Sequence, residues 1–184
     1  MQFGILTSLC AVAASAAAQT VLPPKTAPAA PGAVWLYTAF VDCENSLFEM
    51  QTPRGIRTAI PIVGGNFTGP HLSGKILDLG ADWGLTDPQT GLFSADTRYN
   101  LQTHDGANLF LQTSGNTNPD GTSHLRVIIE TGDDRYYWLN NLVAFGLLQL
   151  VATFETYVTL RIDVWHLEGP KYSGTFVNGT KYGL

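Results

Sequence analysis

One stretch decides the fold: residues 60–83, IPIVGGNFTGPHLSGKILDLGADW. Short β-prone runs alternate in it with glycines, which the backbone needs where it takes a positive φ or passes close to another strand. The stretch therefore predicts strands joined by tight turns, and these strands set the register for the chain on either side.

Strand patterns continue in both directions, rich in aromatic and β-branched residues and separated by Gly, Pro, Asn and Asp. Residues 93–103 alternate most clearly, with Phe93, Thr97 and Tyr99 on one face, and Asp105-Gly106 then predicts a hairpin. Strands are expected at residues 34–41, 54–63, 75–79, 81–86, 93–103, 107–113, 124–131, 135–140, 142–150 and 153–167. For residues 142–150 a short helix is the alternative.

No sustained helical period and no internal repeat accompanies these patterns. Short connections favour antiparallel pairing, and closing such a sheet removes its free edges. The sequence therefore predicts an all-β fold, a single antiparallel β-barrel of about eight to nine strands. A barrel of that size leaves room for side chains or for one small ligand.

The composition fits one globular domain in a chain of 184 residues. Hydrophobic residues make up 45% and charged residues 14%, and the formal net charge is -5. The ten Lys and Arg residues form no basic run, which argues against nucleic acid and against an anionic membrane as partners.

The N-terminus predicts secretion. Residues 1–18 read as a signal peptide because an apolar run ends in Ala16-x-Ala18, the small residues that signal peptidase requires. A Pro/Ala-rich linker is expected over residues 19–32 and the barrel domain over residues 33–184. The expected location is outside the cell or in the lumen of the secretory pathway.

Two further features depend on secretion. Sequons for N-glycosylation stand at Asn66 and Asn178, of which Asn178 is preferred because it lies among glycines near the C-terminus. Cys10 leaves with the signal peptide, so Cys43 has no partner for an internal disulfide. A buried, inert thiol is the favoured interpretation; an intermolecular bridge in a homo-oligomer is the alternative.

Known catalytic motifs are missing. Residues 69–75, GPHLSGK, imitate a phosphate-binding loop, but Ile76 stands where Ser or Thr must hold magnesium and a strand pattern follows. The four histidines show no metal-binding spacing. We therefore predict no metal and no cofactor.

The candidate site consists of polar residues set among aromatics on the expected strands. Asp96 and Arg98 point to the same face and can pair, either in the interior of the barrel or on its exterior. The candidate catalytic residues are Asp82, Asp96, Arg98 and Glu130, and the candidate ligand-binding residues are Trp83, Tyr99, Arg135, Trp138 and Asn140.

At these residues the chain resembles the small barrel proteins of the domain of unknown function 3237 family. The resemblance covers roughly residues 33–167 and implies a calycin-like, or lipocalin-like, barrel without established catalytic residues. It rests on Pro61-Ile62-x-Gly64-Gly65-x-Phe67-x-Gly69-Pro70, Gly74, Gly80-Ala81-Asp82-Trp83, Asp96-x-Arg98-Tyr99-x-Leu101, Asp105-Gly106-Ala107 and Glu130-Thr131-Gly132-x-x-Arg135-Tyr136-x-Trp138-Leu139-Asn140.

Two functions remain open from the sequence. The favoured one is a secreted glycoprotein whose barrel binds an apolar small molecule and can also transform it. The alternative is a cofactor-free cyclase, isomerase or lyase of secondary metabolism, in which carboxylates supply acid–base catalysis and arginines stabilise negative charge.

Overall fold

The computed structural model describes residues 29–169. The signal-peptide prediction and the Asn178 sequon lie outside the described residues. The elements are β1 (Gly32–Glu44), β2 (Phe48–Thr52), β3 (Gly55–Thr68), β4 (Ser73–Asp82), β5 (Leu85–Thr86), β6 (Phe93–Thr103), β7 (Asn108–Asn116), β8 (Ser123–Glu130), the 3-10 helix η1 (Tyr137–Asn141), β9 (Ala144–Thr153) and β10 (Tyr157–Glu168).

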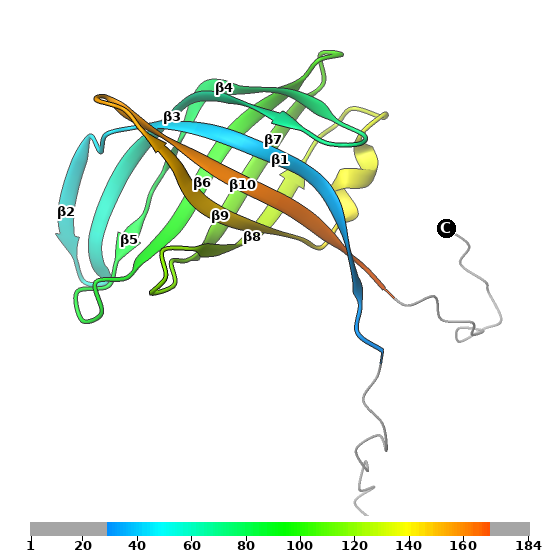
Figure 1. Cartoon of the computed structure of the whole chain (residues 1–184). Helices are drawn as coiled ribbons and strands as arrows, with labels where there is room; N and C mark the ends of the chain where they lie inside the picture. The colour runs from blue at the N-terminus through cyan, green and yellow to red at the C-terminus, as the bar shows by residue number, and fades with distance from the viewer. Residues whose placement is uncertain (1–28, 170–184) are drawn as a thin grey trace, which may run out of the picture.

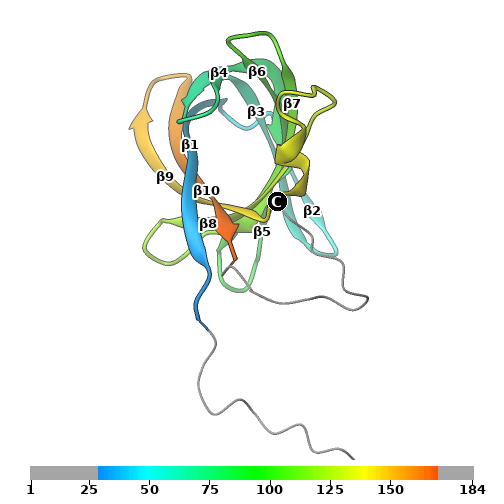
Figure 2. The ribbon, with the colours of Figure 1, turned by 90° about the vertical axis from the view of Figure 1, so that its right-hand side faces the viewer.

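All ten strands belong to one antiparallel sheet, which closes into a ring (Figures 1 and 2). The order is β1-β10-β9-β8-β7-β6-β4-β3, and β3 pairs again with β1. β2 pairs with the start of β3, while β5 lies between β3 and β6. The all-β, antiparallel prediction is confirmed, with ten strands instead of eight to nine.

The glycine-rich stretch contains fewer turns than its composition predicts. β3 runs without a break through Gly64 and Gly65, and its pairing with β4 shifts register between Pro61 and Asn66. Gly65 has φ 124, and a Cβ there would lie 2.0 Å from the carbonyl oxygen of Phe40 on β1. This glycine therefore produces an irregularity in the ladder and a close approach of two strands.

Gly80 behaves in the same way. The prediction of two strands separated by Gly80 is wrong, because β4 continues through it to Asp82 and only the register with β6 shifts. A Cβ on Gly80 would lie 2.6 Å from the carbonyl oxygen of Arg98. The short β5 then follows as a separate strand.

The strand predicted over residues 135–140 is also wrong. Most of the segment forms η1, and the N–H groups of Leu139 and of Tyr136, the residue before the helix, donate to the carbonyl oxygens three residues earlier. The Asp133 side chain accepts from the backbone N–H and the guanidinium of Arg135, which fixes a turn where a strand would have to begin. Local side-chain bonds thus override the β-prone composition of the segment.

The strand predicted over residues 153–167 begins later. Phe154 was expected on its apolar face, but it lies in the turn between β9 and β10, is half exposed and stacks on Tyr157. β2 is a strand that the sequence patterns did not reveal.

The half of the ring nearest η1 is filled by side chains. Tyr37 and Phe67 meet edge to face with ring centroids 5.7 Å apart, and Leu101, Leu109 and Leu139 are almost completely buried around them. Each such side chain contributes roughly 1.5–3 kcal/mol through burial. This end of the ring is therefore a solid core, capped by Leu139 of η1.

Candidate functional site

The other half of the ring, near β2 and β5, contains a cavity of about 230 Å³. The burial of the inward-facing residues of β10 shows that the cavity is open to solvent at this end of the ring. Ile162 and Val164 are buried, whereas Val158 and Leu160, at the start of the strand, are only partly buried. We call the opening, where Phe93 and Val158 lie, the mouth. Cavities of about 150 Å³ hold benzene, so this one has room for a molecule of one or two small rings.

One wall of the cavity is polar. Asp82 comes from the end of β4, Thr97 and Tyr99 from β6, and Thr113 from β7. The hydroxyl oxygens of Thr97 and Thr113 lie 2.6 Å apart, and Thr97 also accepts the backbone N–H of Thr113 at 3.2 Å. The two hydroxyls thus form a fixed pair in the wall.

The rest of the lining is mainly apolar. Thr117 and Ser123, whose hydroxyl oxygens lie 3.0 Å apart, add a second polar pair. The other lining residues are Val41, Cys43, Ile60, Ile62, Phe93, Ala95, Leu148, Val158, Leu160 and Ile162. An apolar chamber with a few convergent polar groups is the usual form of a small-molecule site.

Asp82 is the one carboxyl among the described residues of the polar wall. Its burial raises the pKa of the carboxyl to about 6, an effect that the nearby charge of Asp96 increases. The hydrogen bond from the backbone N–H of Asp96 to Oδ1, 2.8 Å long, and the charge of Arg57 oppose this shift. Oδ2 has no hydrogen-bond partner among the described residues, and the Asp82 side chain lines the cavity.

The other two titratable groups of the lining stay neutral. Burial raises the pKa of the Cys43 thiol to about 12, with the charges of Asp82 and Asp42 adding to the effect. Burial also raises the pKa of Tyr99 well above its ordinary value. Asp82 is therefore the lining group whose charge changes near neutral pH. Cys43 is a free thiol buried inside the ring, so it is not placed to form a disulfide with a second protein molecule.

Of the predicted site residues, the structure brings Asp82 and Tyr99 into this cavity. Asp96 and Arg98 occupy the opposite face of β6, where they form an exterior ion pair of 2.7 Å with both side chains nearly half exposed. Strand alternation explains the result, because Thr97 and Tyr99 point inward. Trp83 also lies outside the cavity and is 43% exposed.

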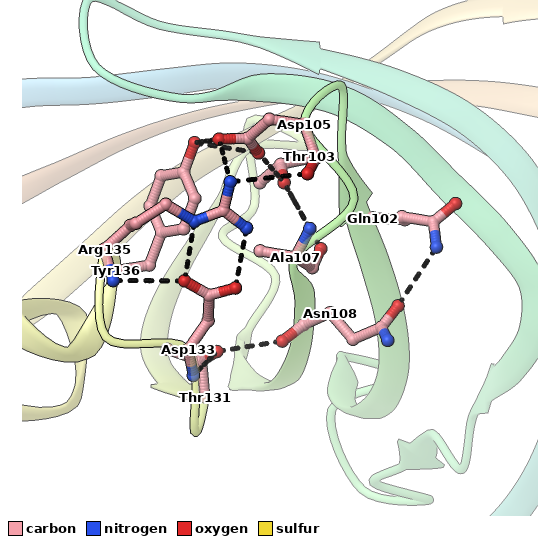
Figure 3. Close-up of polar contacts among 9 residues, drawn as sticks. All are labelled: Gln102, Thr103, Asp105, Ala107, Asn108, Thr131, Asp133, Arg135 and Tyr136. Atoms are coloured by element: carbon pink, nitrogen blue, oxygen red, sulfur yellow. Dashed lines mark hydrogen bonds and ion pairs between the residues drawn. The ribbon is translucent and has the colours of Figure 1, made fainter.

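The remaining predicted residues lie near the capped end of the ring, away from the cavity. Arg135 bonds the carboxylates of Asp105 and Asp133, and Tyr136 donates to Asp105 (Figure 3). These contacts fasten the start of η1 to the turn between β6 and β7. Three further predicted residues, Glu130, Trp138 and Asn140, are exposed there.

Asn66 is exposed on the exterior of β3, between β1 and β4. Thr68, the third residue of its sequon, is exposed on the same face. The acceptor is thus open to solvent but lies on a paired strand.

Sequence reasoning did not select Thr97, Thr113 or Cys43 as site residues. The alternation of residues 93–103 places Thr97 on the same face as Tyr99, so the choice of Tyr99 as a site residue also pointed to Thr97. Thr113 faces Thr97 across the β6–β7 hairpin, so its place depends on the register of that hairpin. Cys43 gave no comparable signal, because β1 approaches this wall only when the ring closes.

Two further features concern residues 29–169. No group of three or more His, Cys, Asp or Glu side chains is placed to hold a metal ion in that range. Nor does that part of the chain include a helix with the length and apolar character needed to cross a membrane.

The model of the family described as "Protein of unknown function (DUF3237)" matches residues 31–127. A protein of Penicillium herquei named hydroalkoxylation enzyme phnH is 28% identical over 146 residues, which cover 79% of this chain and 89% of that protein. A UPF0311 protein of Rhodopseudomonas palustris is 35% identical over 82 residues, or 45% of this chain and 52% of that protein.

Solved structures share the fold. A beta-barrel like protein of Acinetobacter baumannii is 31% identical, with a TM-score of 0.65 over 77% of this chain and 99% of that one. A structure described as an enzyme from Penicillium herquei has a TM-score of 0.62 over 78% of this chain and 98% of that one, at 23% identity. The second likeness is evidence of fold alone.

Proposed function

The chain belongs to the DUF3237 family, and from this premise and the geometry of the cavity we propose that it is a cofactor-free enzyme acting on an apolar small molecule. The reaction proposed is of the hydroalkoxylation type, the addition of a hydroxyl group across a carbon–carbon double bond to form an ether. The observation that carries the proposal is Asp82, a buried carboxyl with a pKa raised to about 6, inside a mainly apolar chamber. The name of the Penicillium herquei relative supports the choice of reaction.

Asp82 can supply both proton transfers that this addition requires. The protonated carboxyl donates to one alkene carbon, the substrate hydroxyl oxygen bonds to the other, and the hydroxyl proton returns to the carboxylate. The carbon–carbon π bond and the O–H bond break while a C–O and a C–H bond form, so no oxidant or reductant is consumed. Acid–base catalysis of this kind contributes about 10²–10⁴-fold in rate.

The rest of the rate enhancement is expected from the way the cavity positions the substrate. An apolar chamber excludes water that would otherwise capture a cationic intermediate, and it folds a flexible substrate so that hydroxyl and alkene meet. The paired hydroxyls of Thr97 and Thr113 offer a hydrogen-bonding point for the substrate hydroxyl.

The test uses 2-prenylphenol, a neutral phenol with an unsaturated side chain, and follows its conversion to 2,2-dimethylchroman by chromatography. We expect wild type to accelerate the conversion and Asp82→Asn to lower the rate by about 10² or more. Asn preserves the acceptor oxygen for the Asp96 N–H but cannot deliver the proton.

Asp96→Asn is the matched control, since it removes a neighbouring carboxylate on the exterior face. It should retain most of the activity. Equal rates for wild type and Asp82→Asn would refute the proposed role of Asp82.

Binding without turnover is the second candidate, favoured by the predominance of apolar side chains in the lining. Binding without turnover is also compatible with a calycin-like fold, because one fold can serve both carriers and enzymes. A carrier would retain an unchanged ligand through purification, which mass spectrometry of a solvent extract would reveal.

We propose secretion as the setting of this activity, on the basis of residues 1–18 and the exposed Asn66. Expression with these residues in a fungal secretory host should deliver the protein to the medium. Endoglycosidase treatment should then increase its mobility on a gel, and Asn66→Gln with Asn178→Gln should abolish that shift.

A further inference from the structure

The two sides of the cavity differ in chemistry. The carboxyl and most hydroxyl groups lie on β4, β6 and β7, and the Thr117–Ser123 pair adds hydroxyls between β7 and the start of β8, whereas the facing part of the lining, on β9 and β10, is hydrocarbon. The hydrocarbon side consists of Leu148, Val158, Leu160 and Ile162. A ligand that satisfies both sides has an apolar body with a polar group at one edge.

The charges restrict that polar group further. Among the described residues that line the cavity there is no Lys, Arg or His, and Asp82 is the sole carboxyl. The guanidinium of Arg57 donates to the backbone carbonyl of Trp83, and Arg98 pairs with Asp96 on the exterior. A ligand carboxylate would therefore enter a water-poor chamber that offers a like charge and no cation, which is unfavourable on both grounds.

We infer that the cavity selects uncharged, hydroxyl-bearing ligands and rejects the carboxylates of the same skeleton, with Asp82 as the group that rejects them. This inference rests on the proposed function, because it concerns the same cavity and narrows the substrate class. The ligand hydroxyl meets the Thr97–Thr113 pair beside Asp82. Free fatty acids and aryl carboxylates are therefore excluded.

Two ligands with one ring system test the inference: 2-naphthylmethanol and 2-naphthoate. Their binding is measured by calorimetry at pH 8, where the naphthoate and Asp82 are both ionised. Wild type should bind the alcohol at least tenfold more tightly than the carboxylate. Asp82→Asn should reduce that ratio to about threefold or less, because the like charge is gone.

Asp96→Asn again provides the matched control, since it removes a carboxylate whose side chain faces away from the cavity. Its ratio should equal that of wild type. The ratio of the two affinities in wild type is measured without any variant, so it tests the selectivity even if Asp82→Asn fails to fold.

The outcomes separate this inference from the function on which it rests. Tight alcohol binding with equal or tighter naphthoate binding would overturn the selectivity and leave small-molecule binding intact. An unchanged ratio in folded Asp82→Asn would overturn the role assigned to Asp82. Failure of wild type to bind either compound, together with no conversion of 2-prenylphenol, would overturn the inference and the proposed function together.

Discussion

At the scale of the residue, Asp82 makes the protein's stability depend on pH. Burial raises the pKa of its carboxyl from 3.8 to about 6, so the folded chain holds this proton more tightly than the unfolded chain. The stabilising contribution is complete below about pH 4 and is lost as the pH rises through about 6. A difference of about two pKa units corresponds to about 3 kcal/mol.

We therefore expect Asp82→Asn to raise the free energy of unfolding relative to wild type at pH 8, by up to about 3 kcal/mol. At pH 4 the two proteins should differ much less. Urea titrations at both pH values measure the difference, and Asp96→Asn serves as the comparison. A variant less stable than wild type at pH 8 would contradict the burial of a charged carboxylate.

At the scale of the element, the segment between β4 and β5 shapes the mouth of the cavity. A Cβ on Gly84 would lie 2.0 Å from Cζ of Phe93, whose ring lines the cavity. Gly84→Ala should push this ring aside and weaken 2-naphthylmethanol binding about tenfold, or 1.4 kcal/mol. Adding Phe93→Leu should restore part of the affinity.

Gly132→Ala is the control for this series, because no heavy atom lies within 4 Å of a Cβ placed there. It should bind the probe as wild type does. Unaltered binding in Gly84→Ala would show that the ring of Phe93 does not control access.

The helix η1 closes the other end of the ring through one buried side chain. Leu139 is 1% exposed, so Leu139→Ala should lower the free energy of unfolding by about 2–5 kcal/mol. Arg135→Met removes solvent-exposed ion pairs and should cost much less. Chemical denaturation distinguishes the two, and a larger loss for Arg135→Met would mean that the polar network, not the leucine, holds the cap.

At the scale of the whole molecule, closure of the ring depends on the pairing of β1 with β3. Gly65 permits that pairing, whereas nothing lies within 4 Å of a Cβ on its neighbour Gly64. Gly65→Val should destabilise the protein by about 3 kcal/mol or more and expose the amides of this strand pair to hydrogen exchange. Gly64→Val should have a much smaller effect on both measurements.

Local alternation made much of the ring predictable from sequence. Residues 93–103 were expected as a strand with Thr97 and Tyr99 on one face, and β6 has those bounds and that face. Residues 135–140 were mispredicted because the turn at Asp133 depends on side-chain hydrogen bonds that composition does not express. At Gly80 the glycine serves a close approach between strands, which only the three-dimensional pairing shows.

The site was less predictable than the fold for a physical reason. Sequence patterns show that Asp96 and Arg98 share a face, but they do not show which face closes inward. Asp82 could be selected from its aromatic surroundings, whereas its unusual pKa arises from burial by strands far away in the sequence. The cavity itself exists only because the side chains of one half of the ring leave it unfilled.

The solid core beneath the cavity has a kinetic consequence. Since Leu139, Tyr37 and Phe67 fill the end beneath η1, a ligand has to enter and depart through the same opening. If the protein catalyses the proposed reaction, product and substrate exclude each other from the cavity, and competitive product inhibition is expected. Product release would then limit turnover whenever the product is as apolar as the substrate.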